Sequence, residues 1–338
     1  MSEQTSAAST SLPAHREEAT FKNYNSTDAT KYAAYRPSYP PLLIKMVMEG
    51  HTSTGGQTTT VLDIGCGPGI ATRQIAAFFE HAIGVDAGQS MIETARNTPC
   101  YSSTGEQARF EVCGAEEIDK VIDAESVDLI TVATAAHWFD MPRFYAAASK
   151  VLKPSGTIAM WCAGSWYVDP RTTPNAAEVQ SLWTELDLEV LKPFEVRGNV
   201  LSRTLYDGLP LPWTVPPDSV SPEVASALTS YDEQHSSRQE FNKDGTPDPR
   251  PEFAATKGYL VHVRMPYDVG AKRIGTASQV TRWRQHHKEA LEKGEIEDCI
   301  EYMMRRTKAK IAEVEGHENR DWLDIGSSMV LLTVKKKA

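Results

Sequence analysis

The sequence predicts an α/β fold, with a mostly parallel sheet that carries helices on both faces. Two patterns support this prediction. Short apolar segments rich in β-branched residues alternate with helical segments from residue 61 to residue 165, and this alternation is typical of right-handed strand–helix–strand units. A glycine-rich turn, "GCGPG" at residues 65–69, joins the first of these strands directly to a helix. Such a turn commonly allows a nucleotide to lie against the backbone.

The apolar patterns place the elements along the chain. The pair Pro40-Pro41 begins a helix, because proline is tolerated in a first helical turn. Five strands are expected within residues 61–64, 81–88, 108–118, 126–139 and 153–164, with helices after the first, second and fourth. Beyond residue 165 we expect a helix at 175–191, a proline-punctuated loop at 240–253, a strand at 258–269, two helices within 277–315 and a last strand at 327–334.

The composition limits the classes of function. The chain has 338 residues and a formal net charge of −10. No segment supplies the basic face of a nucleic-acid-binding protein, and no apolar stretch is long enough to span a bilayer. The five cysteines are scattered without metal-ligand spacing, which favours reduced thiols in a cytoplasmic protein. We therefore expect neither a nucleic acid nor a membrane as partner, and no metal.

The glycine spacing separates two kinds of ligand. A dinucleotide-binding loop reads G-x-G-x-x-G, but here Ile70 stands at the position of the third glycine. Asp63 precedes the first glycine by two residues, and Asp86 ends the next expected strand. An acid at the place of Asp86 can accept hydrogen bonds from ribose hydroxyls. The alternative is a glycine-rich turn without a ligand, and the strand before it and the helix after it favour the ligand.

The set Asp63, Gly65, Gly67, Gly69 and Asp86 resembles the class I S-adenosylmethionine-dependent methyltransferases. The resemblance implies a Rossmann-like, mostly parallel seven-stranded sheet with an antiparallel last strand and a helical cap. It also implies S-adenosylmethionine as cofactor and S-adenosylhomocysteine as product. The residues expected to bind the cofactor are Tyr24, Tyr32, Arg36, Asp63, Gly65, Cys66, Gly67, Asp86, Ala87, Met91, Ala115, Glu116 and Ala133.

The segments "YAAYRPSYP" and "AAHWFDMPRFYAAASKVLKPSG" are similar to a narrower group, the fungal trans-aconitate and cantharidin methyltransferases. In that group the N-terminal segment folds over the cofactor as a lid, here with Tyr24, Tyr32, Tyr35, Arg36 and Tyr39. The alternative is that the tyrosines pack a surface helix. The expected organisation is a disordered tail at 1–20, a helical lid at 21–60, a cofactor-binding core at 61–165, a substrate cap at 166–258 and a return to the sheet at 259–338.

His137 and Trp138 follow the fourth strand, where such enzymes line the transfer site. His137 is a candidate base or donor, with an orienting or structural role preferred, and Trp138 is expected to wall the pocket. Arg264, Arg282 and Arg284 are uncommitted candidates to bind an acidic acceptor. The expected function is methylation of a small molecule, with a carboxylic acid giving a methyl ester as the leading example. A protein that binds the cofactor without methylating, or that serves as a regulatory subunit, is the alternative.

Overall fold

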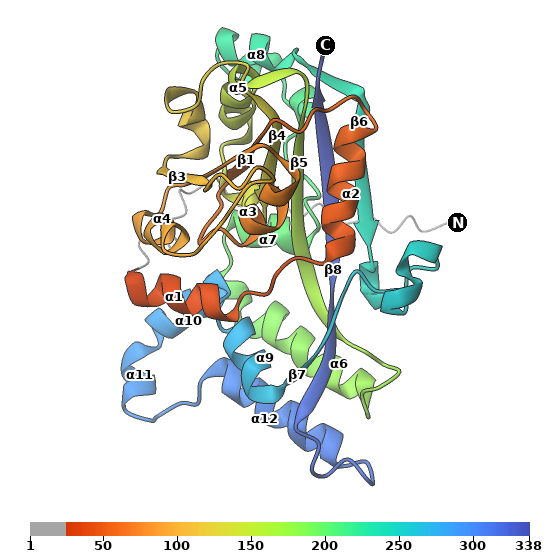
Figure 1. Ribbon diagram of the computed structural model, residues 1–338. Coiled ribbons are helices and arrows are strands. Elements are labelled where there is room, and N and C mark those ends of the chain that lie inside the picture. The colour runs from red at the N-terminus through yellow and green to blue at the C-terminus, as the bar shows by residue number, and fades with distance from the viewer. Residues whose placement is uncertain (1–24) are drawn as a thin grey trace, which may run out of the picture.

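The computed structural model of the chain describes residues 25–338. Tyr24 and the expected tail at residues 1–20 lie outside the described residues. Figure 1 shows an upright sheet whose two long strands, β5 and β8, continue downward into a group of helices. The strands are β1 (Thr60–Ile64), β2 (His81–Asp86), β3 (Arg109–Val112), β4 (Val127–Ala133), β5 (Leu152–Val168), β6 (Tyr231–Phe241), β7 (Val261–Pro266) and β8 (Trp322–Lys336).

The helices fall into three groups along the chain. Some precede β1, some alternate with the parallel strands, and the rest form the elaboration after β5. They are α1 (Ser26–Tyr35), α2 (Pro41–Thr52), α3 (Ile70–Ile75), α4 (Gln89–Arg96), α5 (Met141–Val151), α6 (Ala176–Glu185), α7 (Arg197–Arg203), α8 (Pro222–Leu228), α9 (Tyr267–Ile274), α10 (Ser278–His286), α11 (Lys288–Glu292) and α12 (Cys299–Ala312), with short 3₁₀ turns that include η2 (Ala115–Lys120) and η3 (Ala136–Trp138).

The sheet confirms the predicted fold class and adds one strand to the seven expected. Its order is β3-β2-β1-β4-β5-β8-β6, and β7 also pairs with β8. Strands β1 to β5 are parallel, whereas β8 runs antiparallel to β5, β6 and β7. The extra strand fits because β8 is 15 residues long. One part of its free edge pairs with β6, and residues 322–327 pair with β7.

Alternate residues of the central strands feed two apolar layers, as the period of a strand requires. Val61, Leu129 and Trp161 face the layer formed with α2, α3 and α4. The neighbouring residues Leu62 and Ile130 face the layer formed with α5, α7 and α8. Because both faces are covered, the ligand-accessible positions of the parallel strands lie at their carboxyl ends.

A third apolar cluster joins the lower ends of β5 and β8 to the helices of the elaboration. Val168 and Ile325 pack there with side chains of α6, α9, α10 and α12, including Trp183 and Trp283. These helices lie below the sheet in Figure 1, and α1 lies between them and the sheet. We call α6, α7 and α9 to α12 the cap helices. Within residues 25–338, no helix is both long and apolar enough to cross a membrane.

Candidate functional site

The glycine-rich turn lies where the strand order reverses, between β1 and β4. Gly65, Gly67 and Gly69 all have positive φ, at 64°, 54° and 80°. A Cβ on Gly65 would lie 2.5 Å from the Cβ of Ala135, which follows β4, so the two loops are in direct contact there. A Cβ on Gly67 would meet no atom of residues 25–338 within 4 Å. The turn is therefore packed at Gly65 and open at Gly67, at the place where parallel sheets bind ligands.

The carboxylate of Asp86 holds this turn against the end of β2. Its Oδ2 accepts a hydrogen bond of 2.8 Å from the backbone N–H of Gly67. Its Oδ1 accepts one of 2.7 Å from the N–H of Gly88, just before α4. Burial raises the pKa of Asp86, and the two backbone N–H groups oppose that rise. Each carboxylate oxygen has two lone pairs, so Asp86 can accept a further hydrogen bond from a hydroxyl group of a ligand.

Asp63 lies beneath the turn rather than on its surface. The side chain is buried, and its two oxygens accept hydrogen bonds from the hydroxyls of Thr72 on α3, at 2.6 Å, and Thr131 on β4, at 2.8 Å. Burial raises the pKa of Asp63 to about 6. Its contacts therefore fix α3 against β4 below the turn. The predicted contact with a cofactor stays a prediction.

The other expected cofactor residues line the carboxyl ends of the same strands. Met91 is buried on α4, Ala87 is exposed after β2, and Ala133 ends β4. Cys66 is buried beside Gly84, and burial raises the pKa of its thiol. Ala115 and Glu116 begin η2.

One carboxylate oxygen of Glu116, Oε1, accepts a hydrogen bond of 2.8 Å from the N–H of Asp140. This contact ties the loop after β3 to the loop after β4. The second oxygen, Oε2, is then free to accept a hydrogen bond from an adenine amine, and this contact stays a prediction.

The segment after α1 reaches over the ends of β4 and β5. The hydroxyl of Tyr39 lies 3.2 Å from Oγ1 of Thr134, and its ring meets Trp161 edge-on at 5.4 Å. Gln74 on α3 bonds both the N–H and the carbonyl of Tyr39. Arg36 stacks over the ring of Tyr32 at 4.9 Å, and among residues 25–338 its buried Nε has no hydrogen-bond partner. The segment is thus bonded to α3, the helix that follows the glycine turn. The Nε of Arg36 remains free to donate a hydrogen bond to a ligand.

His137 and Trp138 form one wall of the region after β4. His137 is 8% exposed, and its Nδ1 lies 3.2 Å from the hydroxyl of Tyr206. Burial, helped by the charge of Arg36, lowers the pKa of His137 to about 3. Trp138 packs against Gly198 of α7, where a Cβ would lie 2.2 Å from its ring. A neutral, buried imidazole suits the orienting role better than that of a strong base.

Part of the chain that contains this site is similar to known proteins. A family model described as a methyltransferase domain matches residues 61–156, which contain the turn, Asp86, Glu116 and His137. Residues 61–156 are therefore similar to a methyltransferase domain. Their sheet and turn agree with the fold that the sequence predicted. The narrower resemblance to trans-aconitate and cantharidin methyltransferases is not established by the match.

The chain also resembles curated methyltransferases of other organisms and one solved structure. The chain is 34% identical over 44% of its length to a candidate methyltransferase of Dictyostelium discoideum and 32% identical over 44% to a candidate S-adenosylmethionine-dependent methyltransferase of Saccharomyces cerevisiae. These matches span 51% and 47% of the relatives, so the chain matches about half of each. A candidate type II methyltransferase from Anaeromyxobacter dehalogenans has a similar fold, with a TM-score of 0.59, 23% identity and coverage of 88% and 97% of the two chains.

Several residues around the candidate site carry no signal in the sequence. Leu205 and Tyr206 both have positive φ, at 56° and 63°, a conformation that costs energy for side chains of this size. The turn directs Tyr206 toward His137. Thr134 also has a positive φ, of 57°, and bonds Tyr39. Because these roles depend on contacts between distant segments, the sequence pattern could not reveal them.

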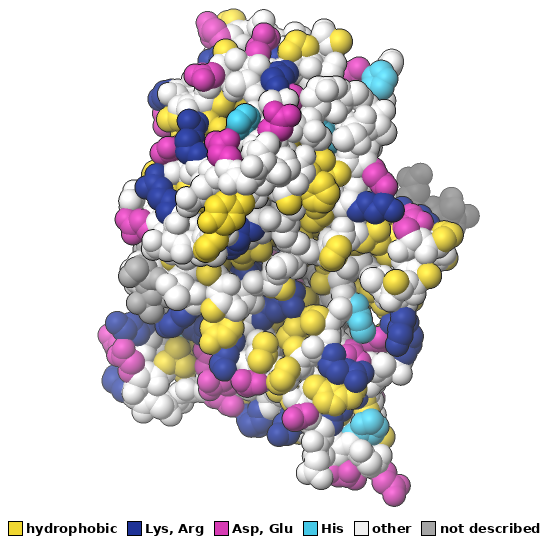
Figure 2. Space-filling view, viewed as in Figure 1, with side chains coloured by type: hydrophobic (Ala, Val, Ile, Leu, Met, Phe, Trp, Pro, Cys, Tyr) yellow, Lys and Arg dark blue, Asp and Glu magenta, His cyan; other side chains and the backbone are white. Residues whose placement is uncertain are grey.

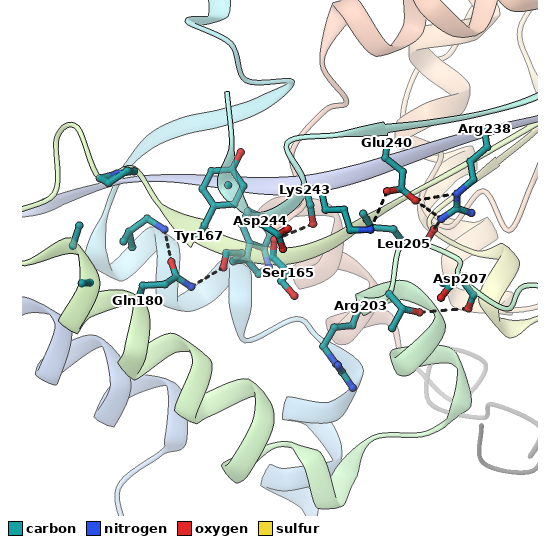
Figure 3. Close-up of a pocket in the computed structure, with 18 residues that line it drawn as sticks. Ser165, Tyr167, Gln180, Arg203, Leu205, Asp207, Arg238, Glu240, Lys243 and Asp244 are labelled. Atoms are coloured by element: carbon teal, nitrogen blue, oxygen red, sulfur yellow. Dashed lines mark hydrogen bonds and ion pairs between the residues drawn. The ribbon is translucent and has the colours of Figure 1, made fainter. Parts of the chain in front are cut away.

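Figure 3 shows a pocket of about 840 Å³ on the other side of this turn. It lies between the outer half of β5, α6, the turn after α7 and the end of β6, and Leu205 lines it. Three of its charged side chains form ion pairs: Glu240 lies 2.6 Å from Arg238 and 3.4 Å from Lys243. Tyr206, the neighbour of Leu205, faces His137 instead. The turn thus separates this pocket from the wall formed by His137.

The three arginines considered as acceptor ligands are all engaged elsewhere. Arg264 binds both oxygens of Asp324, and Arg284 binds both oxygens of Asp298. Arg282 donates from Nε to the carbonyl of Phe194 at 2.8 Å. The Arg264 contact joins β7 to β8, and the other two join segments of the elaboration after β5.

Proposed function

We propose that the protein is a methyltransferase that uses S-adenosylmethionine to methylate a small molecule, with a carboxylic acid as the leading acceptor. The observation that carries the proposal is the open space over Gly67, flanked by the carboxylate of Asp86. The buried, unpartnered Nε of Arg36 adds a donor that suits the carboxylate of the cofactor. A cytoplasmic location is part of the proposal and is supported by the five free cysteines.

S-adenosylmethionine, when bound, supplies a methyl group on a cationic sulfur. A carboxylate oxygen forms the new bond to carbon while the carbon–sulfur bond breaks and its electron pair returns to sulfur. The products are a neutral ester and a neutral thioether, so no acid is required. The chain's own contribution is to hold the reactants in line and to keep water out. Tyr39, His137 and Trp138 lie where they can do both.

The side chains that cover the ends of β4 and β5 favour a small acceptor. Tyr39 is fastened over the strand ends by Thr134 and Gln74. His137 is almost wholly buried behind Trp138 and α7. We infer that a small acceptor suits this enclosed position better than a folded macromolecule. The direct test is transfer of radiolabelled methyl groups to a panel of small acids and phenols, with the mass of each product. Tight cofactor binding without transfer to any acceptor would point to a non-methylating or regulatory protein instead.

We expect Arg36→Ala to weaken the binding of S-adenosylhomocysteine about tenfold or more, because a charge-assisted hydrogen bond contributes roughly 1.5–3 kcal/mol. Isothermal titration calorimetry measures the change. Lys31→Ala, on the helix α1 that ends just before Arg36, is the matched control, since this side chain is exposed, and it should leave the affinity within twofold. An unchanged affinity in Arg36→Ala would show that Arg36 does not bind the cofactor.

With a carboxylate acceptor, kcat should be independent of pH between about pH 7 and pH 9, above the pKa of about 6 of the buried Asp63. The acceptor is ionised throughout that range, and His137, with its pKa near 3, is neutral throughout it. Stopped assays in overlapping buffers measure the profile. A fall in kcat below pH 7, with an apparent pKa near 6.5 that disappears in His137→Gln, would instead identify His137 as a base.

A further inference from the structure

The turn after α7 holds a tyrosine in an unfavourable backbone conformation. Leu205 and Tyr206 follow one another with positive φ, which costs energy for residues of this size and persists only where the surroundings enforce it. The N–H of Tyr206 donates to the carbonyl of Leu201 at 2.7 Å. Arg238, on β6, donates to the carbonyl of Leu205 at 2.7 Å. The fold therefore keeps Tyr206 in one position despite the strain.

This position sets the hydroxyl of Tyr206 against His137. Tyr206 is 1% exposed, and its hydroxyl lies 3.2 Å from Nδ1 of His137. The opposite ring nitrogen, Nε2, has no hydrogen-bond partner among residues 25–338, and it is not wholly buried. One nitrogen of the imidazole thus meets the protein, and the other can meet a ligand.

The loop that carries His137 lies directly against the glycine turn. A Cβ on Gly65 would lie 2.5 Å from the Cβ of Ala135 and 3.4 Å from the ring of Phe139. His137 stands between these two residues, in η3. A change at the ring of His137 is therefore a change in the wall next to the proposed cofactor site.

The imidazole of His137 is neutral. Burial, and after it the positive charge of Arg36, lower the pKa of His137 to about 3. Arg36 directly follows α1, and Figure 2 shows Lys and Arg side chains along the seam between α1 and the cap helices. A neutral imidazole carries a single N–H, at Nδ1 or at Nε2. The hydrogen bond at one nitrogen decides whether the other donates or accepts.

The groups around the Tyr206 hydroxyl determine where that proton lies. The backbone N–H of Ala136 hydrogen-bonds to the hydroxyl oxygen. The thiol of Cys162 also contacts the hydroxyl, but its own S–H donates to the carbonyl of Ser202 at 3.7 Å. The O–H of Tyr206 is then left with two acceptors, and a thiol sulfur is a weak one. The imidazole nitrogen is the stronger, so Tyr206 donates to Nδ1 of His137.

We propose that Tyr206 is a positioning residue for methyl transfer: its hydroxyl fixes His137 in the tautomer with the proton on Nε2, and this N–H donates a hydrogen bond to an oxygen of the methyl acceptor. The proposal rests on the proposed function of the same site. A carboxylate can bind Nε2–H through one oxygen while the other oxygen attacks the methyl carbon. Tyr206 itself touches neither reactant and acts through His137.

Nuclear magnetic resonance of the full-length protein, labelled with ¹⁵N-histidine, tests the tautomer without any acceptor. The signals that vanish in His137→Gln identify those of His137. We expect the Nε2–H form in the wild type. In Tyr206→Phe the ring-nitrogen signals should shift, because Nδ1 loses its hydrogen-bond donor. An Nδ1–H form in the wild type, or signals unchanged in Tyr206→Phe, would overturn the proposal.

A double-mutant cycle tests whether Tyr206 acts through His137. With the small acid that is methylated fastest, Tyr206→Phe should lower kcat/KM about tenfold, the value expected for one hydrogen bond. Adding Tyr206→Phe to His137→Gln should lower kcat/KM less than twofold further, because the group to be positioned is already gone. Losses that multiply in the double variant would show that Tyr206 acts independently of His137 and would contradict the proposal.

Tyr231→Phe is the matched control for Tyr206→Phe. Tyr231 is also buried, and its hydroxyl donates to the carbonyl of Tyr145 at 2.7 Å, away from His137. The control should lower the melting temperature about as much as Tyr206→Phe does, and it should change kcat/KM less than twofold. Equal losses of kcat/KM in the two variants would assign the effect to packing and defeat the proposal.

The further proposal and the proposed function fail separately. Calorimetry should give Tyr206→Phe an affinity for S-adenosylhomocysteine within threefold of the wild type. A larger loss would assign Tyr206 to the cofactor site, which would refute its role toward the acceptor and leave the proposed methyltransferase function intact. Cofactor binding without transfer to any acid would count against the proposed function and against the acceptor contact of Nε2–H. The spectra would then still decide whether Tyr206 fixes the tautomer of His137.

Discussion

Gly67→Ala should reduce the affinity for S-adenosylmethionine on the order of 100-fold and leave the fold nearly as stable as that of the wild type. A Cβ at this position meets no atom of the described residues within 4 Å, so it would project into the space proposed for the cofactor. The only cost to the fold is the positive φ of 54°, roughly 1 kcal/mol for an alanine. Calorimetry with S-adenosylhomocysteine and thermal unfolding of the unliganded protein measure the two effects.

Two further variants, Gly65→Ala and Gly55→Ala, separate the loss of cofactor contact from steric clash and from backbone strain. Gly65 also has positive φ, but its Cβ would lie 2.5 Å from that of Ala135. We therefore expect it to lower the free energy of unfolding by roughly 3 kcal/mol. Gly55, with φ of 84° and no atom within 4 Å, lies in the loop before β1 and tests backbone strain alone. If Gly67→Ala binds the cofactor as tightly as Gly55→Ala does, the cofactor does not lie against Gly67.

The parallel half of the sheet could be predicted because its strands are buried on both faces. Residues 61–64 and 127–133 are almost continuously apolar, and each is followed by a helical pattern. Strand β6 could not be predicted in the same way. Of its 11 residues only Tyr231 and Phe241 are buried, since it lies at the sheet edge and pairs with β8 alone. Its conformation depends on a partner nearly 100 residues away, which a local pattern does not contain.

In the candidate site, too, local features could be predicted and long-range contacts could not. The glycines and Asp86 act within a short stretch around one turn, so their spacing predicted a site that the fold brings together. The arginines differ in partners rather than in sequence context. Arg264 is neutralised by Asp324, 60 residues away, whereas Arg273, near the end of α9, has no carboxylate within 4.0 Å among the described residues. Sequence reasoning singled out the former and passed over the latter because only the folded chain shows which cations are already paired.

Asp86→Asn should reduce the affinity for the cofactor about 30-fold or more, and Asp86→Ala should reduce it further. The carboxylate accepts hydrogen bonds from the N–H groups of Gly67 and Gly88. An asparagine keeps one acceptor oxygen and places an NH₂ group against the other N–H. Hydrogen bonds to a charged group contribute roughly 1.5–3 kcal/mol each, so the turn loses its position and the proposed ribose contact is lost with it.

Asp128 provides the matched control for Asp86. Its carboxylate also accepts two backbone N–H groups, those of Thr59 and Thr60, at 3.1 and 2.7 Å. It lies, however, near the amino end of β4, at the opposite edge of the parallel strands from the glycine turn. Asp128→Asn should therefore lower the melting temperature but leave cofactor affinity within threefold. If both variants lose affinity equally, the effect of Asp86 comes from general loosening of the sheet. A loss of cofactor affinity in Asp86→Asn alone would place the cofactor at the carboxyl ends of the parallel strands.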